Sequence, residues 1–110
     1  MNQPATIYTV FASIEDELRR AQSLHPFWPV EPLGQMAIIQ EEIGEAAKEV
    51  VEITFGKHND IGKLKTELIQ SAATIVRMLA VIEDNPTYGK TITRPTQKVD
   101  KRIPEPFEIN

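Results

Sequence analysis

Hydrophobic side chains recur at steps of three and four residues in three windows of the chain, residues 6–24, 33–55 and 61–83. This period places them on one face of an α-helix, with polar side chains on the other face. The apolar positions are Ile7, Val10, Phe11, Ile14, Leu18 and Ala21 in the first window; Met36, Ile39, Ile43, Ala46, Ala47 and Val50 in the second; and Ile61, Leu64, Leu68, Ala72, Ile75, Leu79 and Ile82 in the third. The pattern predicts three amphipathic helices and no strand.

Prolines mark where these helices must end. One proline precedes the first window, three separate it from the second, and four follow the third. A helix interior disfavours proline by ~3 kcal/mol, so each helix is expected to lie between these clusters. Gly56 is expected to end the second helix, and Asn59 or Asp60 to cap the start of the third.

The predicted fold is all-α. The second and third helices form a hairpin, and the first packs across it. Residues 1–84 make one helical domain, and residues 85–110, rich in proline and without a period, form an extended tail. Because three amphipathic helices leave much apolar surface uncovered, we expect an oligomeric assembly of the four-helix-bundle type, a homodimer or a homotetramer.

Composition and charge exclude several classes of protein. Of the 110 residues, 41% are hydrophobic and 25% charged, which is typical of a folded domain. The net charge of −4 disfavours a binder of nucleic acid polymers, and the absence of cysteine excludes disulfides and thiolate sites. No secretory signal is visible at the start, and no apolar run is long enough to span a bilayer. We therefore expect a cytoplasmic protein without a membrane partner.

Acidic residues gather on the second predicted helix. Stepping ~100° per residue from Ile43, we place Glu42, Glu45 and Glu49 on one flank of its apolar stripe. The same step from the centre of the third helix places Glu67 and Gln70 on the equivalent flank. The two helices thus carry matching polar flanks. Glu52 falls roughly opposite the apolar stripe and is expected to face solvent.

Two interpretations of these carboxylates remain open from spacing alone. Glu-rich helix surfaces are common, and this one can be a solvated face. Alternatively, the clustered negative charges are neutralised by a hard divalent cation, which Glu pairs at i, i+3 on facing helices can hold.

Two segments bear a resemblance to a known family. Residues 40–47, QEEIGEAA, and residues 67–73, ELIQSAA, resemble the ExxE…ExxD signature of the MazG-like all-α nucleotide pyrophosphohydrolases. Residues 25–32, HPFWPVEP, resemble the linker before the ExxE helix in small phage-type members. The resemblance covers roughly residues 10–83, and the fourth motif position, an Asp in the family, is Gln70 here.

The resemblance implies a specific chemistry. Members of the family are helical dimers or tetramers that hold Mg²⁺ on carboxylates and hydrolyse a nucleoside triphosphate between the α- and β-phosphates. Carried onto this chain, the metal ligands are Glu42, Glu45 and Glu67, with Gln70 in the fourth position. The cofactor is then Mg²⁺ or Mn²⁺, and the products are the monophosphate and pyrophosphate. A neutral amide at Gln70 offers only its carbonyl oxygen to a metal.

Further residues are candidates for roles around such a site. Glu41 or Glu49 is the candidate general base that accepts the proton of the attacking water. The residues that can hold the substrate are Lys48, Lys63 and Arg77 through the phosphates and Trp28 through the base. Solvated salt bridges for the three cations, and closure of the bundle end by Trp28, are the competing interpretations. His25 and His58 are both expected to be exposed.

The sequence thus predicts a Mg²⁺-dependent nucleoside triphosphate pyrophosphohydrolase. A rival from another class also stands: a catalytically lapsed helical bundle that binds a nucleotide or a protein. Gln70 keeps this rival open, because it removes one negative charge from the predicted metal site.

Overall fold

The computed structural model describes residues 3–89 of the chain. Within this part there are three helices and no strand: α1 (Gln3–Leu24), α2 (Pro32–Thr54) and α3 (Ile61–Asp84). The helices coincide closely with the three predicted windows, so the all-α class is confirmed. Most of the predicted tail, residues 90–110, lies outside the described residues.

The ends of α2 and α3 follow local backbone chemistry. Pro32 stands in the first turn of α2, where its missing N–H costs nothing. Gly56 has a φ of 75°, a left-handed conformation that favours glycine, and it ends this helix as predicted. The backbone N–H of Lys63 donates to Asp60 Oδ1 at 2.9 Å, so Asp60 is the predicted N-cap of α3.

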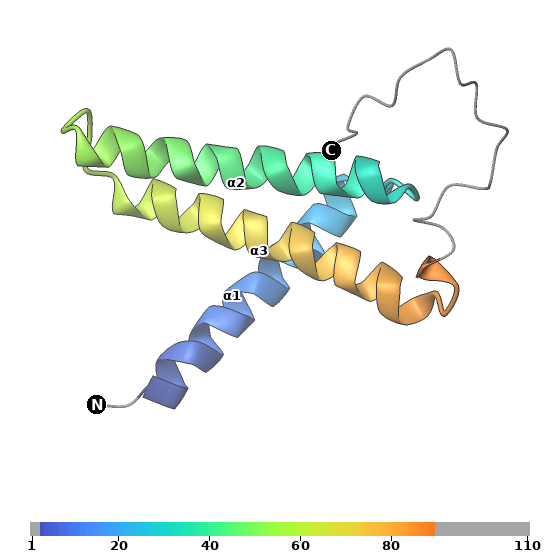
Figure 1. The fold of residues 1–110 in the computed structure, drawn as a ribbon. Coiled ribbons are helices and arrows are strands. Elements are labelled where there is room, and N and C mark those ends of the chain that lie inside the picture. Colours follow the sequence, from blue (N-terminus) through green and yellow to red (C-terminus); the bar gives the residue numbers. More distant parts are fainter. Residues whose placement is uncertain (1–2, 90–110) are drawn as a thin grey trace, which may run out of the picture.

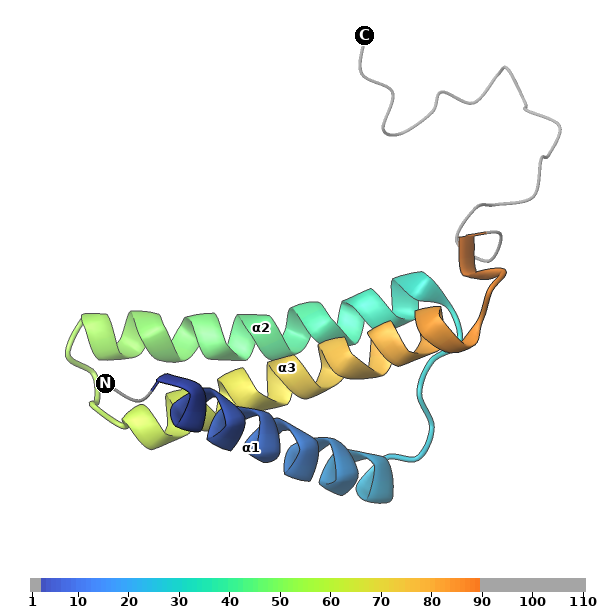
Figure 2. The same ribbon diagram turned by 90° about the horizontal axis from the view of Figure 1, so that it is seen from below.

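The three helices form a hairpin with one helix across it. α2 and α3 run antiparallel and side by side (Figure 1). α1 packs against α3 and crosses it, and residues 25–31 then lead back to the start of α2 (Figure 2). This is the predicted arrangement.

A polar side chain joins three segments at one end of the hairpin. Gln35 of α2 is fully buried and donates from Nε2 to the carbonyl oxygen of Pro29 at 2.8 Å. Its Oε1 accepts from the hydroxyl of Tyr88, which follows α3, at 3.2 Å. Tyr88 is itself buried, so the packed part of the chain extends at least this far into the segment predicted as a tail.

Much of the predicted apolar stripes is not covered within one chain. On α2, Ile39 and Ala46 are buried, whereas Met36, Ile43 and Val50 are exposed. The reason is that α3 packs on the edge of the stripe where Gln35 and Glu49 also lie, and not on its centre. The exposed apolar side chains of α3 are Ile61, Leu68, Ile75, Leu79 and Ile82.

Candidate functional site

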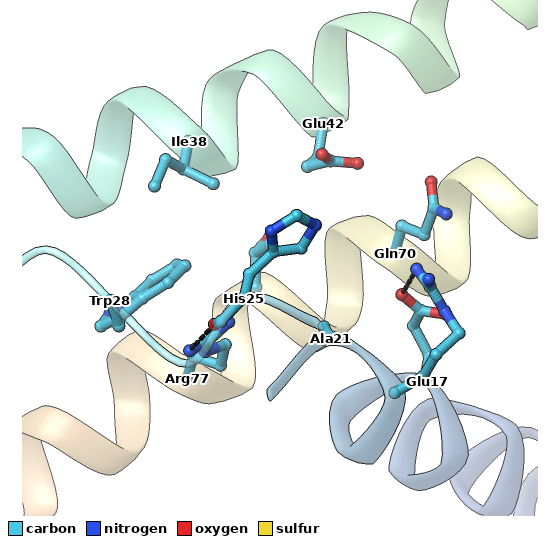
Figure 3. A pocket seen from close by; sticks show the side chains of 11 residues that line it. Glu17, Ala21, His25, Trp28, Ile38, Glu42, Gln70 and Arg77 are labelled. Carbon is cyan, nitrogen blue, oxygen red and sulfur yellow. Dashed lines mark hydrogen bonds and ion pairs between the residues drawn. The ribbon is translucent and has the colours of Figure 1, made fainter. Parts of the chain in front are cut away.

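A pocket of about 430 Å³ opens between the three helices and the linker that follows α1. Glu42 of α2 and Gln70 of α3 lie on facing helices at this pocket, with Glu17 of α1 beside Gln70 (Figure 3). Trp28 and Arg77 line its other side. One residue of each predicted flank, Glu42 on α2 and Gln70 on α3, therefore lies at this cavity.

Carboxylates crowd around Glu42. Burial raises the pKa of Glu42 above its usual range, and the charges of Glu67, Glu41, Glu45 and Glu17 raise it further. Glu42 thus lies close enough to Glu45 on its own helix and to Glu67 across the hairpin to be repelled by both charges. Such repulsion is relieved by a proton or by a cation.

The chemistry of the predicted donors, and not a preformed geometry, suits a hard divalent cation: among the described residues Glu42, Glu45 and Glu67 do not bring their ligand atoms within 4.8 Å of one another. Mg²⁺ prefers oxygen ligands, and Glu42, Glu45 and Glu67 offer carboxylates from two facing helices. Gln70 lines the same pocket, and its carbonyl oxygen is the fourth donor available there.

The opposite side of the pocket is cationic and aromatic. The guanidinium of Arg77 lies over the ring of Trp28, 4.6 Å from its centroid, in a cation–π contact. Its Nη2 donates to the carbonyl oxygen of His25 at 3.2 Å. Burial lowers the pKa of Arg77, and the Nε1 of Trp28 is buried without a hydrogen-bond partner. The structure therefore places two of the predicted substrate-binding residues beside the carboxylates.

Glu49 and Lys63 belong to a different cluster. Glu49 is 1% exposed, and its Oε1 lies 3.2 Å from Lys63 Nζ while its Oε2 lies 2.9 Å from His58 Nε2. The hydrogen bond to Glu49 and its charge raise the pKa of Lys63. Glu49 is seven residues from Glu42, or ~10 Å along the helix, and neither it nor Lys63 lines the pocket. Their assignments as base and phosphate binder are not supported by this placement.

Two further expectations at this cluster were wrong. His58 is half-buried between Glu49 and Glu52, and Glu52 Oε1 lies 3.3 Å from His58 Nε2, so neither side chain simply faces solvent. The α2–α3 connection folds back over α2 and brings His58 onto a flank that the helical period alone assigns to water. His25, by contrast, is exposed as expected.

Glu49, Glu52 and His58 each place a ligand atom within 4.8 Å of the others, which is close enough for a metal. The backbone N–H of Asp60, however, donates to His58 Nδ1 at 3.0 Å. The imidazole proton of neutral His58 is therefore on Nε2, whereas a histidine that binds metal through Nε2 donates from its other nitrogen. Because Lys63 already offsets the charge of Glu49, this cluster fits an ion-pair network that holds the connection in place.

We expect Glu49→Gln to destabilise the fold by about 1–3 kcal/mol, because Lys63 and His58 both lose the buried carboxylate that they contact. Urea unfolding of this variant measures the loss, and Lys48→Gln, at an exposed position of the same helix away from the pocket, is the control. An unchanged unfolding midpoint combined with lost turnover would return Glu49 to the role of general base.

The remaining predicted residues lie at the surface. Glu41, Glu45 and Lys48 are exposed, and Lys48 does not line the pocket. Lys48 therefore matches the solvated interpretation.

Sequence reasoning missed two residues, Glu17 and Arg20 of α1, that line the pocket beside Gln70. Their i, i+3 spacing is an ordinary surface pattern, and only the return of the linker brings them to the carboxylates.

In the part of the chain that the structure describes, no helix is both long and apolar enough to cross a membrane. Comparisons with known protein families, with curated proteins and with solved structures find no match to this chain.

Proposed function

We propose that this protein is a metal-dependent hydrolase that cleaves a nucleoside triphosphate between its α- and β-phosphates. The observation that carries the proposal is the pocket in which Glu42 is crowded by carboxylates of α2 and α3 and faces Trp28 and Arg77. A crowd of carboxylates suits a divalent cation, and an arginine with an aromatic ring suits phosphates and a base.

In this proposal Glu42, Glu45 and Glu67 hold Mg²⁺ or Mn²⁺, with the carbonyl oxygen of Gln70 as a further donor. When bound, the ion neutralises charge on the phosphate oxygens and lowers the pKa of water. The crowding around Glu42 supports this assignment. Burial and neighbouring charges disfavour its ionised carboxylate, and a cation offsets both effects.

The chain's own groups take the other roles. Arg77, held over Trp28 and bonded to His25, is positioned to bind phosphate oxygens, and the Trp28 wall is where a base would lie. Since Glu49 already forms an ion pair with Lys63, the role of general base falls to exposed Glu41, next to Glu42 in the sequence. In the reaction the water oxygen bonds to the α-phosphorus, its proton passes to the carboxylate, and pyrophosphate leaves as the bond to the bridging oxygen breaks.

The exposed apolar faces of α2 and α3 support an assembly of several copies. Isolated apolar side chains at a surface are ordinary, but contiguous ones along two paired helices are typical of an interface. We include in the proposal a homodimer or homotetramer that completes a four-helix bundle, working in the cytoplasm on free nucleotides.

The test is to incubate the protein with each common (d)NTP and Mg²⁺ and to assay pyrophosphate and monophosphate. We expect the two products in equal amounts, and none when a chelator replaces Mg²⁺. The neutral amide of Gln70 favours the rival, a lapsed bundle that binds nucleotide without turnover. Saturable nucleotide binding with no product from any triphosphate would establish that rival.

A further inference from the structure

Arg20 is a cation at the pocket whose hydrogen bonds are to a side chain of its own helix. Its Nε and Nη2 donate to the two carboxylate oxygens of Glu17 at 2.8 and 2.6 Å, a fork of two parallel hydrogen bonds within α1. The side chain of Glu17 is only 14% exposed, whereas that of Arg20 is 51% exposed. Both line the pocket that holds Glu42 and Gln70. The pair therefore combines a mostly buried carboxylate at the pocket with a guanidinium that is half exposed to solvent.

The neighbouring ion pair of α1 shows what an ordinary surface pair looks like here. Arg19 and Glu15 are 3.6 Å apart, with side chains that are 74% and 65% exposed. Neither of them lines the pocket. The tighter geometry, the burial of Glu17 and the position at the pocket distinguish Glu17–Arg20 from this pair.

Arg77, the other arginine at the pocket, is held in place. It stacks on Trp28, donates to the carbonyl oxygen of His25 and is partly buried. Among residues 3–89 Arg20 bonds to Glu17 alone, and the fork that fits a carboxylate also fits the oxygens of a phosphate. Two guanidiniums thus line the same cavity as Glu42: that of Arg77, held by Trp28 and His25, and that of Arg20, held by Glu17.

We propose that this pocket binds a phosphate chain between Arg77 and Arg20, and that Arg20 exchanges Glu17 for a phosphate group when the chain enters. The inference rests on the proposed function for the nature of the ligand. A phosphate chain carries more negative charge than one carboxylate and so competes for the guanidinium, while the divalent cation that accompanies the chain offsets the charge left on Glu17. Glu17 is then a competitor that keeps Arg20 neutralised until the ligand arrives.

The exchange predicts opposite effects for the two partners. Titration of the protein with inorganic tripolyphosphate and Mg²⁺ tests the exchange. Binding is monitored by calorimetry and by the fluorescence of Trp28, the one tryptophan of the chain. We expect Arg20→Gln to weaken binding by ~10-fold or more, since a charge-assisted pair of hydrogen bonds is lost. Arg20→Lys keeps the charge without the fork and is expected to bind with intermediate affinity. Glu17→Gln removes the competitor and is expected to tighten binding several-fold.

Arg19→Gln and Glu15→Gln are the matched controls, and both are expected to bind like the wild type. Equal affinities of Arg20→Gln and Arg19→Gln would overturn the inference, as would weaker binding in Glu17→Gln, because a merely structural ion pair moves both partners in the same direction. Failure of the wild type to bind tripolyphosphate would overturn it as well. Loss of binding in Arg20→Gln in a protein that hydrolyses no triphosphate would support this inference while contradicting the proposed activity, so the two failures are distinguishable.

Discussion

Glu42→Gln is expected to abolish pyrophosphate release and to weaken Mg²⁺ or Mn²⁺ binding by at least ~100-fold, because changing residues that only orient a metal ligand already costs about 10- to 100-fold. Glu42 is the residue at which burial and the surrounding carboxylates converge. Calorimetric titration with Mn²⁺ and assay of pyrophosphate measure the two effects independently. Unchanged metal affinity in this variant would remove the carboxylate cluster as the metal site.

In the absence of metal, Glu42→Gln is expected to stabilise the fold. The pKa of Glu42 is raised on folding, so its ionisation costs more in the folded than in the unfolded chain. At a pH below 4.5, the ordinary pKa of glutamate, Glu42 is protonated in both the folded and the unfolded chain, and this cost is absent. As the pH rises through the higher pKa of folded Glu42, the wild type loses stability and the glutamine variant does not.

Urea unfolding in the presence of a chelator should therefore show Glu42→Gln more stable than the wild type at neutral pH, with the difference fading on acidification. Added Mg²⁺ should reverse the order, because only the wild type gains stability from the cation. A variant less stable than the wild type at neutral pH without metal would contradict the crowding of carboxylates around Glu42.

Local signals in the sequence were enough to predict the helices. Their apolar periods, the prolines between them, Gly56 and the cap at Asp60 all act over a few residues. That Glu42 and Gln70 lie on corresponding flanks of their helices was also predictable, since the ~100° step fixes the relative direction of side chains on each helix. Both residues indeed line one pocket.

The positions of Glu49 and Glu17 depend on contacts that a helical period does not encode. Glu49 lies on the same predicted flank as Glu42, but His58 of the α2–α3 connection and Lys63 of α3 contact its two oxygens and place it in an ion-pair cluster. Glu17 comes to the pocket only because the linker returns the chain across the hairpin. Such a crossing is set by tertiary packing, and nothing in the spacing within α1 marks it.

Which part of each apolar stripe is buried within one chain was not predictable, for a related reason. A period identifies which side chains share a face, but not which part of that face the neighbouring helix covers. Here α3 covers the edge of the α2 stripe that includes Ile39 and Ala46, and Ile43 at its centre stays open. By the ~100° step, the exposed stripe of α3 is displaced from the hairpin interface in the same sense as that of α2. Leu68 at its centre also lines a groove with Val10 and Ile14 of α1, so the open face of the hairpin borders α1.

That open face leads to the prediction with the largest effect on assembly. If a second copy covers it, Ile43→Glu places an unpaired charge in an apolar interface and removes the burial of one large side chain. The two terms together exceed about 3 kcal/mol, which corresponds to ~100-fold or more in the dissociation constant of the assembly. Light scattering and sedimentation at micromolar concentration should then show the wild type as at least a dimer and the variant as a monomer of lower stability.

Phe27→Glu is the matched control, because Phe27 is a larger apolar side chain that is 93% exposed in the linker and not on this face. It should leave the mass unchanged. A monomeric wild type that unfolds cooperatively would show that the thin core of Ile39, Ala46 and Ala73, with the buried Gln35 network, is sufficient by itself. Dissociation by Ile43→Glu, with binding of tripolyphosphate retained, would instead show that the open face of α2 and α3 holds the copies together while each chain carries its own phosphate-binding arginines.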